Sequence, residues 1–95
     1  MDDRQAYIDK VQARIDAWNA EIDKLQARAR EAEADARIEC ETRIKEMRAQ
    51  RDEAESKLRE AREASEAAWG DLRSGFEAAW DSISGAFARA TQRLR

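Results

Sequence analysis

The side chains that most often carry catalysis are scarce in this sequence. Its 95 residues include no histidine and one cysteine, Cys40, so a single chain has neither an imidazole to act near neutral pH nor a second thiolate for a metal or redox pair. Carboxylates and serines are plentiful, but they occur at helical spacing, with no glycine-rich loop and no strand to project them. We therefore expect a protein that is not an enzyme, with no catalytic residue, no cofactor and no bound metal.

Charge patterning narrows the class of partner. The chain has 18 Lys and Arg, 21 Asp and Glu and a net charge of −3 with both signs interspersed, which lacks the basic stripe of a nucleic-acid-binding protein. The longest uncharged run, residues 82–88, is far shorter than the roughly 20 apolar residues that span a bilayer. The acidic opening resembles neither a secretory signal nor a transit peptide. We expect a cytoplasmic protein that binds itself, another protein or the inner membrane face, and no nucleic acid.

The elements that position these side chains are helices. Over the first two thirds of the chain, apolar residues recur alternately three and four positions apart, the spacing of a coiled-coil seam. With no proline in the chain, and no glycine before Gly70, this predicts one long charged helix over residues 1–65. Near Cys40 the spacing becomes four, four and three, a stutter that straightens the supercoil. We expect the seam to pack in a homo-oligomer through Ile8, Val11, Ile15, Trp18, Ile22, Leu25, Cys40, Ile44, Met47 and Leu58.

The outer face of this helix carries acids four residues before bases. Each such pair stabilises a helix by only about 0.2–0.5 kcal/mol, so the charges indicate a solvated surface more than a docking site. The expected pairs are Glu39–Arg43, Glu41–Lys45, Glu53–Lys57 and Glu55–Arg59.

Composition changes near residue 66, and residues 66–95 form a second region that contains all three glycines. AAWGDLRSGFE is followed directly by AAWDSISGAFA, an 11-residue repeat that aligns Trp69 with Trp80 and Phe76 with Phe87. Eleven residues in three turns is close to the undistorted helical period, so the repeat predicts an amphipathic helix with a nearly straight apolar stripe. The stripe consists of Trp69, Leu72, Phe76, Trp80, Ile83, Phe87 and Leu94.

The stripe has two interpretations. In one it is core, packed on a second copy or folded back onto Met47 and Leu58 after a kink near Gly70 to Gly75. In the other its aromatic rings enter a lipid interface, with small polar residues on the opposite face. The sequence leaves a straight rod and a folded-back bundle equally open. Cys40 is interpreted as a small buried apolar side chain, with a redox cross-link between parallel helices as the alternative.

The order of elements is also familiar. The opening AYIDKVQARIDAWNAEIDKLQARA, the middle RAQRDEAESKLREAREASEAAW and the closing AAWDSISGAFARA together resemble a family of small, largely uncharacterised bacterial coiled-coil proteins, usually labelled stress-response proteins. The placements of Trp18, Trp69 and Trp80 carry most of the resemblance, whereas Cys40 stands where the family pattern has tyrosine. The resemblance implies a cytoplasmic, stress-linked role without catalytic residues.

The sequence thus predicts an all-α protein, in which a charged coiled-coil helix continues into an aromatic amphipathic helix. The expected function is a non-enzymatic homo-oligomeric scaffold or protective protein. The alternative is a peripheral membrane-surface protein that binds lipid through its C-terminal helix.

Overall fold

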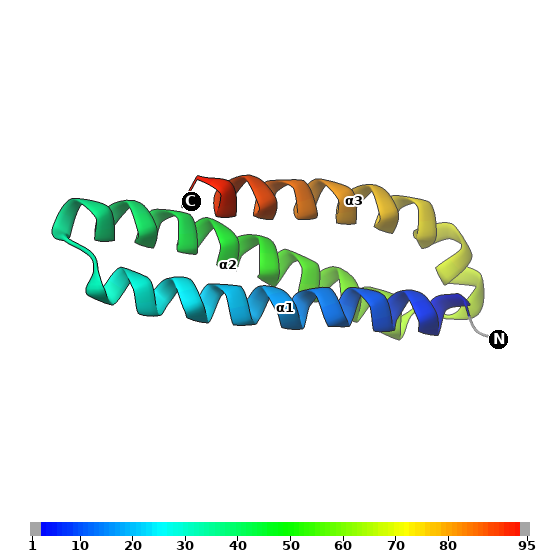
Figure 1. Ribbon diagram of the computed structural model, residues 1–95. Helices are drawn as coiled ribbons and strands as arrows, with labels where there is room; N and C mark the ends of the chain where they lie inside the picture. Colours follow the sequence, from blue (N-terminus) through cyan, green and yellow to red (C-terminus); the bar gives the residue numbers. More distant parts are fainter. Residues whose placement is uncertain (1–2, 94–95) are drawn as a thin grey trace.

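The computed structural model describes residues 3–93, and these form three helices joined by short turns. Helices α1 (Asp3–Glu31), α2 (Ala34–Glu63) and α3 (Glu66–Gln92) each run antiparallel to the one before (Figure 1). Together they make a rod of 52 × 18 × 18 Å. The prediction of an all-α fold is confirmed, and of the alternatives that the sequence left open, the chain adopts the folded-back bundle.

The helix expected over residues 1–65 is in fact two helices, because the chain reverses at Ala32 and Glu33. Glu33 is extended (φ −64°, ψ 160°), and no side chain caps the start of α2 there. Instead, Arg37 in the first turn of α2 reaches back to the end of α1 and closes the turn. Its Nε donates to the carbonyl of Ala29 at 3.3 Å, and its Nη2 donates to the carbonyls of Arg30 and Ala32, both at 3.4 Å. The last carbonyls of a helix lack intrahelical partners, so the guanidinium stabilises this end of α1 without glycine or proline.

The second reversal lies at Ala64 and Ser65, where both residues are extended. Ser65 caps α3 by accepting a hydrogen bond at its Oγ from the backbone N–H of Ala68 at 3.1 Å. From α1, the guanidinium of Arg4 donates to the carbonyl of Ala64. α3 is one continuous helix through Gly70 and Gly75, so the chain folds back at Ala64 and Ser65 and not at these glycines. The kink considered near Gly70 to Gly75 stays a prediction.

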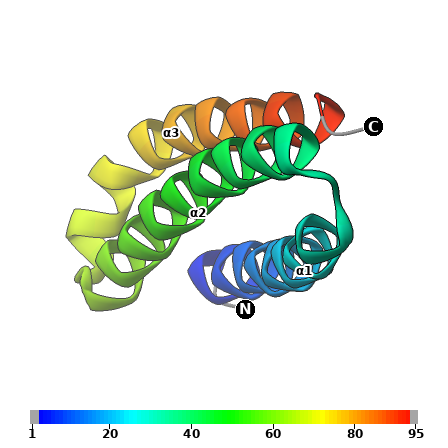
Figure 2. The ribbon, with the colours of Figure 1, turned by 90° about the vertical axis from the view of Figure 1, so that its left-hand side faces the viewer.

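A single core runs along the rod, and α2 packs against both α1 and α3 (Figure 2). The seam that we expected between copies is buried within one chain, against the C-terminal stripe. The seam residues in this core are Ile8, Val11, Ile15, Trp18, Ile22, Leu25, Ile44, Met47 and Leu58, and the stripe residues are Trp69, Phe76, Ile83 and Phe87. Burial of these side chains therefore requires no second copy.

Aromatic rings join α1 to α3. The indole of Trp18 stacks on the indole of Trp80 and on the phenyl ring of Phe87, with ring centroids 5.0 and 4.3 Å apart and interplanar angles of 12° and 11°. Tyr7 meets the ring of Phe76 edge-on at 5.2 Å. Each such pair is worth about 0.5–1.5 kcal/mol beyond the area it buries. Between these bulky contacts, α2 contributes the small buried residues Ala54 and Ala61, which allow its neighbours to approach closely.

The described part of α3 stops short of the turn between α1 and α2. Near its end, the Oγ1 of Thr91 lies 4.0 Å from the Sδ of Met47, whereas α2 begins at Ala34, more than ten residues earlier. Figure 1 shows the paired ends of α1 and α2 projecting beyond the last turn of α3. We call this projection, residues 26–43, the hairpin tip, and we call the part where all three helices pack together, which on α2 begins at Ile44 and Met47, the body.

Candidate interaction surfaces

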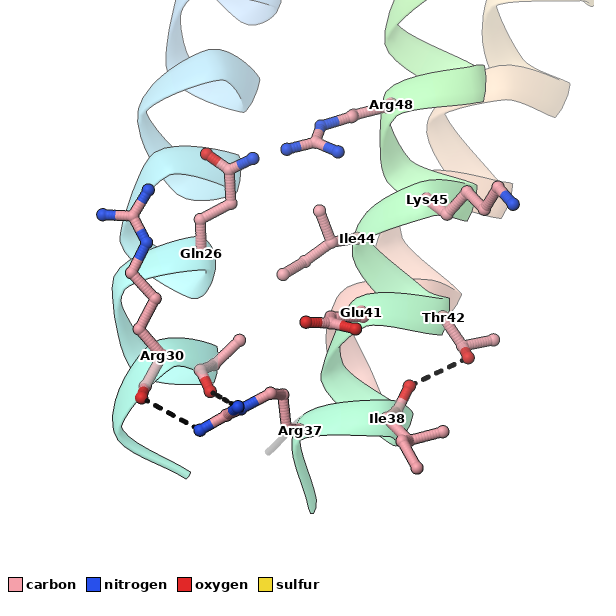
Figure 3. A pocket seen from close by; sticks show the side chains of 10 residues that line it. Gln26, Arg30, Arg37, Ile38, Glu41, Thr42, Ile44, Lys45 and Arg48 are labelled. Atoms are coloured by element: carbon pink, nitrogen blue, oxygen red, sulfur yellow. Dashed lines mark hydrogen bonds between the residues drawn. The ribbon is translucent and has the colours of Figure 1, made fainter. Parts of the chain in front are cut away.

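A groove of about 670 Å³ lies on the hairpin tip, over the end of α1 and the start of α2. We call it the tip groove. In Figure 3, Gln26 and Arg48 project into the gap between the two helices, and Ile44 points from α2 toward α1. Ile38, Thr42 and Lys45 continue the lining on the side of α2 away from α1. The groove therefore wraps around α2 and combines an apolar floor with polar and charged walls.

Ile38 is the feature of the tip groove that sequence reasoning missed. It is 63% exposed, although it precedes the buried Ile44 by fewer than two helical turns. It falls outside the heptad seam, and nothing in its sequence neighbourhood distinguishes it from an ordinary helix-surface residue. An exposed isoleucine leaves a large apolar side chain in water, which association with another molecule would remove.

The charges around the tip groove are predominantly positive. Its lining contains four cations and one carboxylate, namely Arg30, Arg37, Lys45, Arg48 and Glu41. Arg37 is engaged in closing the turn. Within residues 3–93, the side chains of Arg30, Lys45 and Arg48 have no carboxylate at ion-pair distance. Three cations are thus free to meet an acidic partner.

Of the four ion pairs expected on the outer face, only Glu39–Arg43 forms, at 3.0 Å. Arg43 also donates to Glu46 at 3.1 Å, and the hydrogen bonds to Glu46 and then Glu39 raise the pKa of its guanidinium. Elsewhere, bases pair with acids other than the expected ones. Lys57 pairs with Glu60 at 3.6 Å, and Arg51 lies 4.0 Å from Glu55. Several carboxylates are within reach of each base, so the i,i+4 spacing alone does not decide the partner.

The C-terminal stripe enters the core with one exception. Leu72 is 41% exposed, so of the two interpretations given for the stripe, burial in the core does not hold at this residue. Trp80 is half-buried and packs against the core beside Trp18. Leu94 lies outside the described residues. A lipid-inserting stripe would require α3 to leave the bundle, because its rings already face α1 and α2.

Leu72 borders a second, smaller groove of about 230 Å³ between α2 and α3, which we call the tail groove. Its charged lining consists of Glu60, Asp71 and Lys57, and Lys57 is already paired with Glu60. Gly75 forms part of the wall, and apart from the adjacent α3 backbone a Cβ added there would meet no atom within 4 Å. The tail groove is thus open, with an excess of carboxylates.

The described residues include few groups that could hold a metal ion, react as a thiol or titrate at an unusual pH. Between residues 3 and 93 no three His, Cys, Asp or Glu side chains gather closely enough to hold a metal ion. Cys40 is a half-buried free thiol packed against the core, and its redox cross-link stays a prediction. Tyr7 is the group with a perturbed pKa in the core, raised by burial and then by the nearby Glu77 and Asp81. None of the helices in this part of the chain is long and apolar enough to cross a membrane.

Comparison with known proteins adds no relative. No family model, no curated protein and no solved structure matches this chain. The resemblance to bacterial stress-response proteins therefore stays a prediction.

Proposed function

We propose that the protein is a non-enzymatic scaffold that self-associates through the surface of its three-helix rod. The observation that supports this most directly is the tip groove, in which Ile38 is 63% exposed on a part of the rod that α3 does not cover. The seam residues first expected to drive association are already buried within a single chain. A contact between copies must therefore use surface side chains, and the tip groove offers apolar area together with unpaired cations.

Association through this surface would work by two physical effects. Covering Ile38 and the groove floor removes apolar area from water, at about 25 cal/mol per Å². The side chains of Arg30, Lys45 and Arg48 then favour an approach that brings carboxylates to them, which fixes orientation more than it adds affinity. A cytoplasmic, protective role in stress is the biological setting that the family resemblance implies for such a scaffold.

Sedimentation velocity over a range of protein concentrations tests the proposal. We expect the weight-average mass of the natural chain to rise above its 10.9 kDa as concentration increases. Ile38→Glu, which places a carboxylate at the apolar contact, should remain at the mass of one chain. The matched control is Ala13→Glu, which adds the same charge at an exposed residue of α1 that lines neither groove. A natural chain that stays at 10.9 kDa at every concentration overturns the proposal.

The membrane-surface alternative makes a different prediction in the same preparation. If α3 left the bundle to insert its stripe, the protein would float with anionic liposomes and its association in solution would not depend on Ile38. Since Trp69, Phe76 and Phe87 are buried against α1 and α2, we expect it to stay in the aqueous layer at low and at physiological salt.

A further inference from the structure

Two large apolar side chains are exposed in the described part of the chain, Ile38 and Leu72, and each borders a groove. Ile38 lies near the start of α2, at the hairpin tip. Leu72 lies in the second turn of α3, and Figure 1 shows the start of α3 at the other end of the rod from the turn between α1 and α2. The molecule therefore has one exposed apolar contact point toward each end.

The two grooves have opposite charge. The lining of the tip groove holds four cations against the single carboxylate of Glu41. The lining of the tail groove holds the carboxylates of Glu60 and Asp71 against the single ammonium of Lys57. An apolar contact surrounded by complementary charge is the arrangement that selects one orientation between two surfaces.

We infer that the tip groove of one copy binds the tail groove of the next, so that the protein assembles head to tail. In this contact Ile38 packs against Leu72 of the neighbouring copy, while Arg30, Lys45 and Arg48 face its Glu60 and Asp71. This rests on the proposed self-association and names the partner surface. Because the two surfaces differ, each added copy leaves one free tip and one free tail, and growth continues as a chain instead of stopping at a symmetric dimer.

The shape of the tail groove is suited to this role. Gly75 leaves its wall open, because apart from the adjacent α3 backbone no atom lies within 4 Å of where a Cβ would be, so an incoming isoleucine has room beside Leu72. The two grooves lie on different parts of the rod and share no lining residue, so each is available to a different neighbouring copy.

Complementation between two single variants tests the inference. Ile38→Glu disables the tip and leaves the tail intact, and Leu72→Glu does the reverse. Both sites are exposed and glutamate is a good helix former, so both variants should fold, which far-ultraviolet circular dichroism checks. In a mixture, the intact tip of Leu72→Glu can bind the intact tail of Ile38→Glu. The two altered grooves, each with an added carboxylate, repel each other, so the pair cannot grow further.

We expect each variant alone to sediment as a single chain, an equimolar mixture to reach twice that mass and no more, and the natural chain to form larger species. High salt should reduce the doubling. If the natural chain associates but the mixture remains monomeric, or if Leu72→Glu associates as the natural chain does, the head-to-tail contact is wrong while self-association stands. If the natural chain is monomeric throughout, both proposals fall.

Discussion

The body and the hairpin tip of this rod use the same residue types on the same helix in opposite ways. Ile44 on α2 is 3% exposed because α1 covers it, whereas Ile38, on the preceding part of α2, is 63% exposed. In the body, every large seam residue meets another helix of the same chain. The comparison shows that stability and interaction are divided along the length of the rod, with the aromatic core at one part and the exposed groove at another.

The largest expected effect tests whether the body depends on its ring stack. Trp18→Ala removes an indole that contacts both Trp80 and Phe87, and should lower the free energy of unfolding by about 3–5 kcal/mol. Trp80→Ala should cost less, since that ring is only half-buried. Urea unfolding followed by circular dichroism measures both. A loss below about 1 kcal/mol for Trp18→Ala would mean that the rings fill space between α1 and α3 without holding them together.

The two isoleucines give a matched comparison within α2. Ile44→Ala should cost roughly 2–3 kcal/mol, because it leaves a cavity against α1. Ile38→Ala should change the free energy of unfolding by no more than about 0.5 kcal/mol, as is usual for an exposed side chain. The same urea titrations measure both variants. Equal losses of stability would show that Ile38 and Ile44 are equally buried. The distinction between body and tip would then be wrong.

Arg37 tests how the tip is held closed. Arg37→Ala removes the guanidinium that donates to the carbonyls of Ala29, Arg30 and Ala32, and should cost about 1–2 kcal/mol. Hydrogen exchange of the amides at the start of α2 should also accelerate, because the turn opens locally. Arg28→Ala is the control, since Arg28 is an exposed arginine in the last turn of α1, next to the carbonyls that Arg37 contacts. Similar behaviour of the two variants would indicate that the turn needs no such cap.

Periodicity in the sequence was sufficient to predict that the chain is helical and which residues form most of the core. The spacing from Ile8 to Leu25, and the repeat that aligns Trp69 with Trp80, both identify buried faces. Periodicity cannot tell whether a face is covered by another copy or by the same chain. That is why a seam assigned to an oligomer is found inside one molecule.

The turn at Ala32 and Glu33 escaped prediction because its stabilisation is tertiary. No glycine or proline marks it, and Arg37 reaches back over several residues to satisfy the carbonyls. One weak signal was present, since the seam thins to alanines after Leu25, which leaves little to pack on at that end. The tip groove could not be predicted either. It lies beyond the point where Thr91, near the end of the described part of α3, meets Met47, and no local pattern in the sequence indicates how far α3 covers the other two helices.

Gly75 distinguishes a continuous α3 from a hinged one. An alanine at this position meets open space, and glycine inside a helix costs about 0.5–1 kcal/mol relative to alanine. Gly75→Ala should therefore raise the free energy of unfolding by that amount, and Gly70→Ala should do the same. Thermal unfolding measures this. Destabilisation by either alanine would show that α3 bends at its glycines, contrary to the unbroken helix.

The smallest expected effect uses pH to probe the contact between α1 and α3. Tyr7, the only tyrosine in the chain, lies against Phe76 and Trp69, and burial raises the pKa of its phenol above the ordinary value of about 10. Glu77 and Asp81 raise this pKa further, while Arg73 opposes them. Absorbance titration of the folded and the urea-unfolded chain should give a higher midpoint for the folded one.

The same shift makes stability fall with rising pH, because above pH ~10 the unfolded chain loses the phenolic proton that the folded chain still holds. The contribution is fully present below that pH and disappears as pH rises through the folded pKa. The informative quantity is the difference between the natural chain and Tyr7→Phe, which keeps the ring and lacks the proton, because every other group is common to both proteins. We expect the free energy of unfolding of the natural chain to decline more steeply above pH ~10 than that of Tyr7→Phe. If the free energy of unfolding declines equally in both proteins, the phenol is exposed to water. In that case α1 and α3 do not pack around Tyr7.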